Sequence, residues 1–225
     1  MVLRAGALVL RPIGKHEAII WDALRASNYF WTREWDATMP PATTTRPLPF
    51  DRWLRQTNQQ GRAGTLIPWG MAIDPDWPSD PRPPDRTRLM GQLTVANIVL
   101  GSARSATIGY WIDRHYAGRG LTPVAVALAC DYLWQVLRLH RVEIAIRPEN
   151  RPSLRVVEKL GFREEGLRPA FLHIDGDWRD HRIFALNAEE VPGGLLDRYL
   201  DGRPLPVIGR SGGTPFGTGG EFAAG

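Results

Sequence analysis

The sequence has little of what marks secreted, membrane-spanning or nucleic-acid-binding proteins. Cys130 is its only cysteine, so no intrachain disulfide can form. Arg4 and Arg11 bracket too short an apolar stretch for a signal peptide, and no apolar run approaches the length that spans a bilayer. Lys15 and Lys159 are the only lysines among 28 basic residues, and no basic run is present. We therefore expect a protein of the reducing cytoplasm that binds neither a membrane nor nucleic acid directly.

The composition indicates one folded domain with a tail. The chain has 225 residues, of which 43% are hydrophobic, and several of its nine tryptophans must be buried or line a pocket. Its net charge is +4, and nearly all the positive charge is arginine, whose planar guanidinium suits phosphate or carboxylate groups. We expect a single domain over residues 1–190. Residues 191–225 are expected to form a C-terminal extension, which is rich in glycine and disordered from about residue 202.

The hydrophobic periodicity predicts an α/β fold. Four segments are expected to be helices: Lys15–Ser27, Phe50–Asn58, Pro123–Leu137 and Pro152–Leu160. Seven segments are expected to be strands: Ala7–Pro12, Leu66–Ile73, Arg88–Val99, Thr107–Ile112, Val142–Arg147, Gly166–Ile174 and His181–Leu186. The segment from Asp74 to Thr87 contains five prolines, so it is expected to be an extended loop. The aromatic cluster from Tyr29 to Trp35 fits either a pocket or the core.

The most informative local pattern is a glycine-containing turn between a strand and a buried helix. The turn comprises Ala117, Gly118, Arg119, Gly120, Leu121 and Thr122. Such a turn presents backbone N–H groups at a helix N-terminus, where an anionic group can bind. A short Gly-x-Gly turn alone is a weak indication of function. Asn150 and Ser153 begin the next helix, and taken alone they are an ordinary turn residue and an ordinary early-helix residue.

Together these motifs resemble the GNAT superfamily of N-acetyltransferases. The phosphate-loop pattern of that family, Gln/Arg-x-x-Gly-x-Gly/Ala, falls on Ala117 to Thr122, with Ala117 in place of Gln or Arg and Thr122 in place of the second small residue. The resemblance covers Leu8 to Leu186 and is strongest from Ile108. Four further motifs are similar to the Rim-type ribosomal-protein N-terminal acetyltransferases: Asn150-Arg151-Pro152-Ser153, Glu158-Lys159-Leu160-Gly161-Phe162, Glu165-Gly166 and Asp175-Gly176-Asp177-Trp178-Arg179-Asp180-His181.

The resemblance implies a fold and an activity. The fold would be GNAT-like, with a mixed, bent sheet of six or seven strands and about four helices. The activity would be acetyl transfer from acetyl-CoA to a primary amine, namely the N-terminal α-amine of a ribosomal or other protein. Two alternatives stay open: a small-molecule or antibiotic amine as acceptor, and a non-catalytic protein that senses acyl-CoA. The five histidines show no zinc-binding spacing, so we expect no metal, and a monomer or a homodimer fits equally.

The resemblance also implies roles for individual residues. The turn from Ala117 to Thr122 would bind the pyrophosphate of acetyl-CoA through its N–H groups and the helix dipole. The preceding strand ends with Trp111, Ile112 and Asp113, whose backbone would pair with the pantetheine amides. Asn150 would hold the same arm of the cofactor. Ser153 would be the acid that protonates the departing thiolate.

The sequence does not identify the general base. Glu34, Asp113 and Glu143 are candidates, but each is better explained as an ordinary solvated or capping carboxylate. His173 is a further candidate, but a lone histidine in a strand is usually structural. The acceptor amine can also lose its proton through ordered water.

Overall fold

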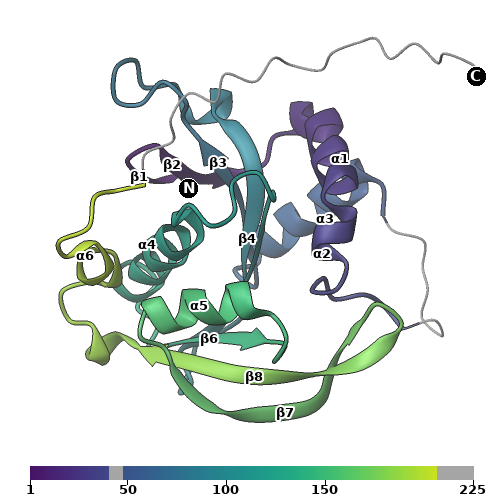
Figure 1. Ribbon diagram of the computed structural model, residues 1–225, viewed down its shortest axis with the longest axis vertical. Coiled ribbons are helices and arrows are strands. Elements are labelled where there is room, and N and C mark those ends of the chain that lie inside the picture. Colours follow the sequence, from purple (N-terminus) through teal and green to yellow (C-terminus); the bar gives the residue numbers. More distant parts are fainter. Residues whose placement is uncertain (41–47, 207–225) are drawn as a thin grey trace, which may run out of the picture.

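The computed structural model describes residues 1–40 and 48–206, which fold around one mixed sheet of eight strands (Figure 1). The strands are β1 (Leu3–Ala5), β2 (Leu8–Pro12), β3 (Ile67–Ile73), β4 (Arg88–Val99), β5 (Ser105–Ile112), β6 (Arg141–Ile146), β7 (Arg163–Ile174) and β8 (Asp177–Asn187). Their order across the sheet is β1-β2-β3-β4-β5-β6-β8-β7. Neighbouring strands are antiparallel except for β5 and β6, which are parallel. The α/β class predicted from the sequence is confirmed.

Six α-helices lie among the described residues: α1 (Ala18–Ser27), α2 (Tyr29–Thr32), α3 (Phe50–Arg62), α4 (Leu121–Gln135), α5 (Arg151–Lys159) and α6 (Leu195–Leu200). Figure 1 shows α4, α5 and α6 grouped on one side of the view and α1, α2 and α3 on the other. The hairpin of β7 and β8 runs below both groups. No helix in this part of the chain is both long and apolar enough to cross a membrane.

The expected counts of six or seven strands and about four helices are too low. The additional strand, β1, is an edge strand of three residues that pairs Leu3 with Leu10. The additional helices, α2 and α6, have four and six residues. Elements this short span barely one repeat of the strand or helix period, so hydrophobic periodicity does not reveal them. The fold class is unaffected.

The helix α4 anchors the main core. Ten of its 15 residues are buried, including Cys130, so the helix is apolar on nearly all sides. The same buried cluster contains Trp69 and Met71 of β3 and Ile144 of β6. A second, smaller cluster is built from Ile13, Leu54 and Leu89, and side chains of α1 and α3 pack against it. The two groups of helices are therefore held to the sheet by separate apolar clusters.

The two parallel strands separate soon after they meet. β5 and β6 pair only where Ser105–Thr107 lie beside Arg141–Glu143. β5 continues to Ile112 while paired with β4, and β6 continues to Ile146 while paired with β8. Each strand therefore turns an unpaired backbone edge towards the gap between them. This gap lies just before the glycine-containing turn that begins α4.

The segment after β8 returns to the core. Val191, Leu195 and Tyr199 are buried in the main cluster, and α6 packs on α4. The carboxylate of Asp131 on α4 accepts hydrogen bonds from the backbone N–H groups of Leu195 at 2.6 Å and Leu196 at 3.0 Å. The C-terminal extension predicted from residue 191 therefore begins with residues that pack on the domain. The predicted disorder falls mainly on residues 207–225, which lie outside the described residues.

Candidate functional site

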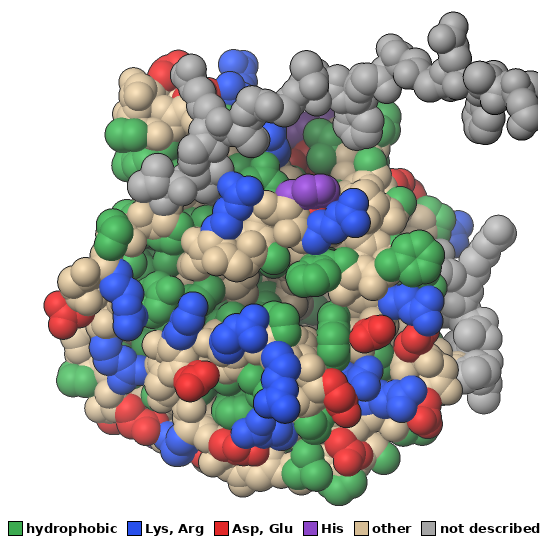
Figure 2. Space-filling view, in the orientation of Figure 1, with side chains coloured by type: hydrophobic (Ala, Val, Ile, Leu, Met, Phe, Trp, Pro, Cys, Tyr) green, Lys and Arg blue, Asp and Glu red, His purple; other side chains and the backbone are tan. Residues whose placement is uncertain are grey.

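A cleft of about 230 Å³ opens where β5 ends. Its walls come from α2, the end of β5, the glycine-containing turn and the first turns of α4 and α5. Figure 2 shows a hollow on this face, bordered by hydrophobic side chains and by several Lys and Arg side chains. Arg155 and Lys159 of α5 line the cleft. The site therefore combines an apolar interior with positive charge at its border, as a ligand with an apolar arm and anionic groups requires.

The glycine-containing turn forms one end of this cleft. Gly118 and Gly120 both have φ of +77°, a left-handed conformation that side chains other than glycine rarely adopt. This conformation lets α4 begin at Leu121, two residues before the expected start at Pro123. The backbone N–H groups of residues 118–122 have no hydrogen-bond partner among the residues that the structure describes. Together with the dipole of a 15-residue helix, they form a site for an anionic group.

The structure brings most of the predicted binding residues to this cleft. Those that line it are Trp111, Ile112, Ala117, Gly118, Gly120, Leu121, Thr122 and Asn150. Asp113 and Arg119 do not line it. Asp113 is buried, and its carboxylate accepts hydrogen bonds from the backbone N–H and the ring of His115. The guanidinium of Arg119 lies 5.7 Å from the ring centre of Tyr116.

A second cavity, of about 270 Å³, occupies the gap between β5 and β6. It is bounded by β4, β5, β6 and the β7–β8 hairpin, with Gln92, Arg147, Leu172 and His181 among its lining residues. Six residues line both cavities: Trp35, Asp36, Tyr110, Trp111, Asn150 and Ser153. The two cavities therefore meet, and these six residues mark their junction.

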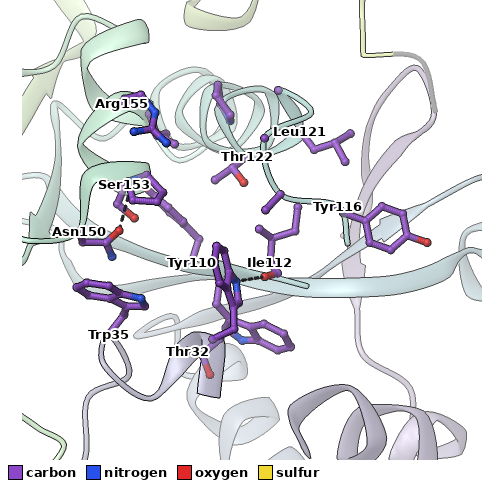
Figure 3. A pocket seen from close by; sticks show the side chains of 18 of the residues that line it. Thr32, Trp35, Tyr110, Ile112, Tyr116, Leu121, Thr122, Asn150, Ser153 and Arg155 are labelled. Carbon is purple, nitrogen blue, oxygen red and sulfur yellow. Dashed lines mark hydrogen bonds between the residues drawn. The ribbon is translucent and has the colours of Figure 1, made fainter. Parts of the chain in front are cut away.

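The side chains at the junction are held by local hydrogen bonding (Figure 3). Oδ1 of Asn150 accepts a hydrogen bond from the backbone N–H of Ser153 at 3.1 Å, which caps α5. The amide Nδ2 of Asn150 has no protein partner in the described residues, so it can donate to a ligand. In the first cleft, Nε1 of Trp31 donates a hydrogen bond to the carbonyl of Ile112 at 3.1 Å.

Tyr110 contributes an unusual hydroxyl to the junction. Burial raises the pKa of its phenol, and the nearby Ser153 hydroxyl only partly opposes this rise. The phenol oxygen is buried and makes no hydrogen bond of acceptable geometry to any described residue. A buried polar group without a partner is rare in proteins, and a catalytic role is one of the explanations for such a group. The Tyr110 hydroxyl therefore stays protonated and is available to donate a hydrogen bond to a ligand.

The candidates for the general base do not line either cavity. Glu143 pairs with Arg141 at 2.9 Å, and Nδ1 of His173 lies 2.8 Å from the hydroxyl of Thr38. Asp113 is engaged by His115, and Glu34 is exposed outside both cavities.

Sequence reasoning missed Tyr110 and His181 as site residues, because a Tyr and a His in strands look like ordinary strand residues.

Other predicted features lie around the two cavities. From the aromatic cluster, Trp31 and Trp35 line the first cleft, whereas Tyr29 and Phe30 are exposed. The loop from Asp74 to Thr87 is tied to β1 through an ion pair between Asp74 and Arg4, and it lines neither cavity. In the described residues, no group of three or more His, Cys, Asp and Glu side chains could hold a metal ion.

Comparisons with known proteins found similar acetyltransferases. A family profile described as an acetyltransferase (GNAT) domain matches residues 7–163. The ribosomal protein uS5-alanine N-acetyltransferase of Escherichia coli K12 is 34% identical over 192 residues, which cover 85% of this chain and 93% of that protein. A probable N-acetyltransferase of Bacillus subtilis strain 168, YjcK, is 39% identical over 99 residues, or 44% of this chain and 55% of that protein. The structure of Mycobacterium smegmatis RimJ in complex with CoA-disulfide superimposes with a TM-score of 0.77 at 31% identity, covering 90% of this chain and 92% of that one.

Proposed function

The chain belongs to the GNAT family of acetyltransferases and transfers acetyl groups from acetyl-CoA to amines, and we propose that its acceptor is the α-amino group at a protein N-terminus. The Escherichia coli relative supports this acceptor class, because it aligns along most of the chain and is named for an alanine of a ribosomal protein. A ribosomal protein is therefore the first substrate to test.

The junction of the two cavities carries this proposal. A transfer reaction requires the thioester carbon and the attacking nitrogen to approach within about 3–3.5 Å. The first cleft has the anion site and the open strand edge that a CoA carrier needs. The second cavity extends away from it between β5 and β6, where a chain-like acceptor can lie. The residues shared by the two cavities are where the acetyl group and the amine would meet.

Two parts of acetyl-CoA, the pyrophosphate and the pantetheine arm, have proposed contacts. The free N–H groups of residues 118–122 bind the pyrophosphate, with Arg155 and Lys159 nearby. The pantetheine arm extends along the open edge of β5, beside Trp111 and Ile112. Nδ2 of Asn150 donates a hydrogen bond to a carbonyl of that arm.

Two hydroxyls are proposed to serve the leaving group. The tetrahedral intermediate collapses by breaking the C–S bond, and the departing thiolate takes a proton from Oγ of Ser153. Tyr110, whose phenol pKa is raised by burial, stays protonated and stabilises the developing negative charge by donating a hydrogen bond. The proton on Ser153 is then restored from solvent.

An α-amine is also favoured by its chemistry. Its pKa lies near 7.7–8.0, whereas that of a lysine side chain lies near 10.4. At neutral pH a useful fraction of an α-amine is therefore already unprotonated and can attack the thioester. An ε-amine requires a strong base to remove its proton. Asp36 is the carboxylate among the six junction residues, and it is engaged in an ion pair with Arg25 at 2.5 Å.

We place the reaction in the cytoplasm. The only cysteine, Cys130, is a buried free thiol, as a reducing compartment permits.

The test compares a peptide that begins with a free alanine and contains an internal lysine with its N-terminally blocked counterpart, using acetyl-CoA and mass spectrometry. We expect acetylation of the free terminus only. Spermidine and an aminoglycoside serve as small-amine alternatives. Acetylation of lysine in both peptides, or of the small amines in preference to the peptide, would contradict the proposed acceptor. Binding of acetyl-CoA without any transfer would identify the protein as a sensor.

A further inference from the structure

His181 lies in the wall of the second cavity. It stands on β8 at the point where β6 stops pairing with that strand, since the last β6–β8 pair joins Ile146 to Arg182. On its other side, His181 pairs with Arg168 of β7, next to a bulge in the β7–β8 register. Its side chain is buried, with 3% of the residue surface exposed, yet it lines the cavity. An imidazole is therefore held at the acceptor side of the junction.

The hydrogen bonding of His181 fixes which nitrogen carries the proton. Nδ1 lies 3.0 Å from the backbone carbonyl oxygen of Arg179. A carbonyl can only accept, so Nδ1 bears the hydrogen and Nε2 keeps its lone pair. Nε2 has no hydrogen-bond partner within residues 1–40 and 48–206. The ring of Phe171, with its centroid 5.7 Å away at an angle of 73°, packs against the imidazole and restrains its orientation.

The surroundings keep this imidazole neutral at physiological pH. Burial lowers the pKa of His181 below its usual value, and the positive charge of Arg147 lowers it further. The hydrogen bond to the carbonyl of Arg179, and after it the negative charges of Asp180 and Glu149, raise the pKa of His181 but do not outweigh the lowering. A neutral imidazole with a free lone pair is the form that accepts a proton.

The other charged groups around the cavity are already engaged. Asp36 forms an ion pair with Arg25 at 2.5 Å. On β7, Arg168 lies 3.5 Å from Glu143 and 5.0 Å from the ring centre of Phe171. Among the described residues that line the second cavity, Tyr110 and His181 are the titratable side chains with an unengaged lone pair. Burial raises the pKa of the Tyr110 phenol, which keeps its own proton, so His181 is the one placed to accept a proton.

We propose that Nε2 of His181 is the general base of the reaction, accepting the proton that the acceptor amine loses as it attacks acetyl-CoA. The nitrogen lone pair forms a bond to the thioester carbon, and the ammonium proton passes to Nε2 directly or through one water. The C–S bond then breaks and the thiolate is protonated separately. His181 returns its proton to solvent after the acetylated product leaves. The inference rests on the proposed placement of the acceptor in the second cavity.

His181→Gln tests this role, because glutamine keeps a polar side chain but is not a base. We expect kcat to fall by about 10²–10⁴-fold, with the KM for acetyl-CoA and the melting temperature nearly unchanged. The pH profile gives a second readout. Wild-type log(kcat/KM) should rise with a slope near 2 below the lowered pKa of His181, because both amine and imidazole must lose a proton, and with a slope near 1 above it. The variant should show a slope near 1 throughout.

His173→Gln is the matched control, because His173 is also buried on the hairpin but binds Thr38 and lines neither cavity. We expect it to retain wild-type kcat and the wild-type pH profile. If His181→Gln keeps near-normal kcat, or keeps the slope of 2, His181 is not the base. If kcat falls and the melting temperature of the variant also falls by several degrees, His181 has a structural role instead.

The assay separates this inference from the proposed acceptor. The variants are measured with the alanine peptide and with spermidine. If the wild-type enzyme acetylates spermidine but not the peptide, the proposed acceptor is wrong. The role of His181 is then tested with spermidine as the acceptor, by the same two measurements: the change in kcat and the slope of log(kcat/KM) against pH.

Discussion

At the scale of single residues, the junction of the two cavities contains two hydroxyl groups in different surroundings. Ser153 faces both cavities at the start of α5, while the Tyr110 phenol is buried and unpartnered. Ser153→Ala should lower kcat at saturating substrates by about 10²-fold, the low end for general acid help, because a thiolate is a fair leaving group. Affinity for acetyl-CoA, measured by calorimetry, should change little.

Ser79→Ala is the control for this variant, since Ser79 is exposed and lies in neither cavity. If Ser153→Ala keeps the wild-type kcat, Ser153 is not the general acid. Its role is then structural, through the backbone N–H that donates a hydrogen bond to Oδ1 of Asn150. Adding Tyr110→Phe to Ser153→Ala would then show whether the phenol carries the role alone.

The glycine-containing turn gives a second prediction for a single residue. Gly120→Glu places an anion where the pyrophosphate binds and forces a side chain into φ of +77°. Affinity for acetyl-CoA should fall at least about tenfold, equivalent to about 1.4 kcal/mol. Gly193→Glu, at a position without left-handed φ and with open space around it, is the control. Equal affinity in both variants, with intact circular dichroism, would remove the turn from the binding site.

The sequence predicted which residues lie at the first cleft only where local sequence determines their position. The turn and Asn150 act through backbone geometry next to them in the chain, so a motif carries the information. Tyr110 and His181 acquire their properties from burial and from strands that are distant in sequence. An alternating strand pattern does not show which side chain will lie without a partner beside a cavity, so neither residue could be chosen from the sequence as a site candidate.

At the scale of elements, α6 is a short helix with a large share in the core. Leu195 is fully buried, and Asp131 caps the backbone at the start of α6. Leu195→Ala should destabilise the fold by about 2–5 kcal/mol. For a domain of this size, each kcal/mol lowers the melting temperature by about 2–4 °C. Differential scanning fluorimetry measures the shift.

A chain that ends after Pro206 keeps α6 and should melt close to the full-length protein, which makes it the control. If Leu195→Ala melts like the wild type, α6 does not contribute to the core as its burial indicates. The importance of this segment was hidden in the sequence, because six residues between glycines and charged residues show no helical period. The longer elements were predictable within a few residues, since each repeats its pattern several times.

At the scale of the whole molecule, ion pairs make stability depend on pH. Burial opposes ionisation of Glu17, but hydrogen bonds from Arg11 and the N–H of Gly14 outweigh it, so the pKa of Glu17 lies below its usual value. Hydrogen bonding from Arg141 brings the pKa of Glu165 down to about 2. Carboxylates with lowered pKa stabilise the fold fully above the unfolded value of 4.5, and this contribution is lost as pH falls towards their folded values.

We therefore expect the melting temperature to fall between pH 5 and pH 3, by on the order of 5–10 °C. Burial raises the pKa of Asp131, so its contribution to stability increases as the pH falls. This one carboxyl group opposes the several carboxylates whose pKa values are lowered. Glu17→Gln should weaken the dependence, because it removes a carboxylate whose pKa the buried ion pair with Arg11 lowers. A melting temperature that stays constant from pH 5 to pH 3 would contradict the assigned ion pairs.

The pairing of β5 with β6 over only three residues leaves backbone groups of both strands without strand partners beyond it. The proposed pantetheine arm, extended along the open edge of β5 beside Trp111 and Ile112, would act as a short ninth strand and should protect amides of β5 from hydrogen exchange. A ligand that binds only the folded chain at 100 times its Kd adds about 2.7 kcal/mol of stability. Resistance to proteolysis, and with it the lifetime of the protein, would then follow the supply of acetyl-CoA. The amount of active enzyme in a cell would then depend on the acetyl-CoA concentration over the lifetime of the protein.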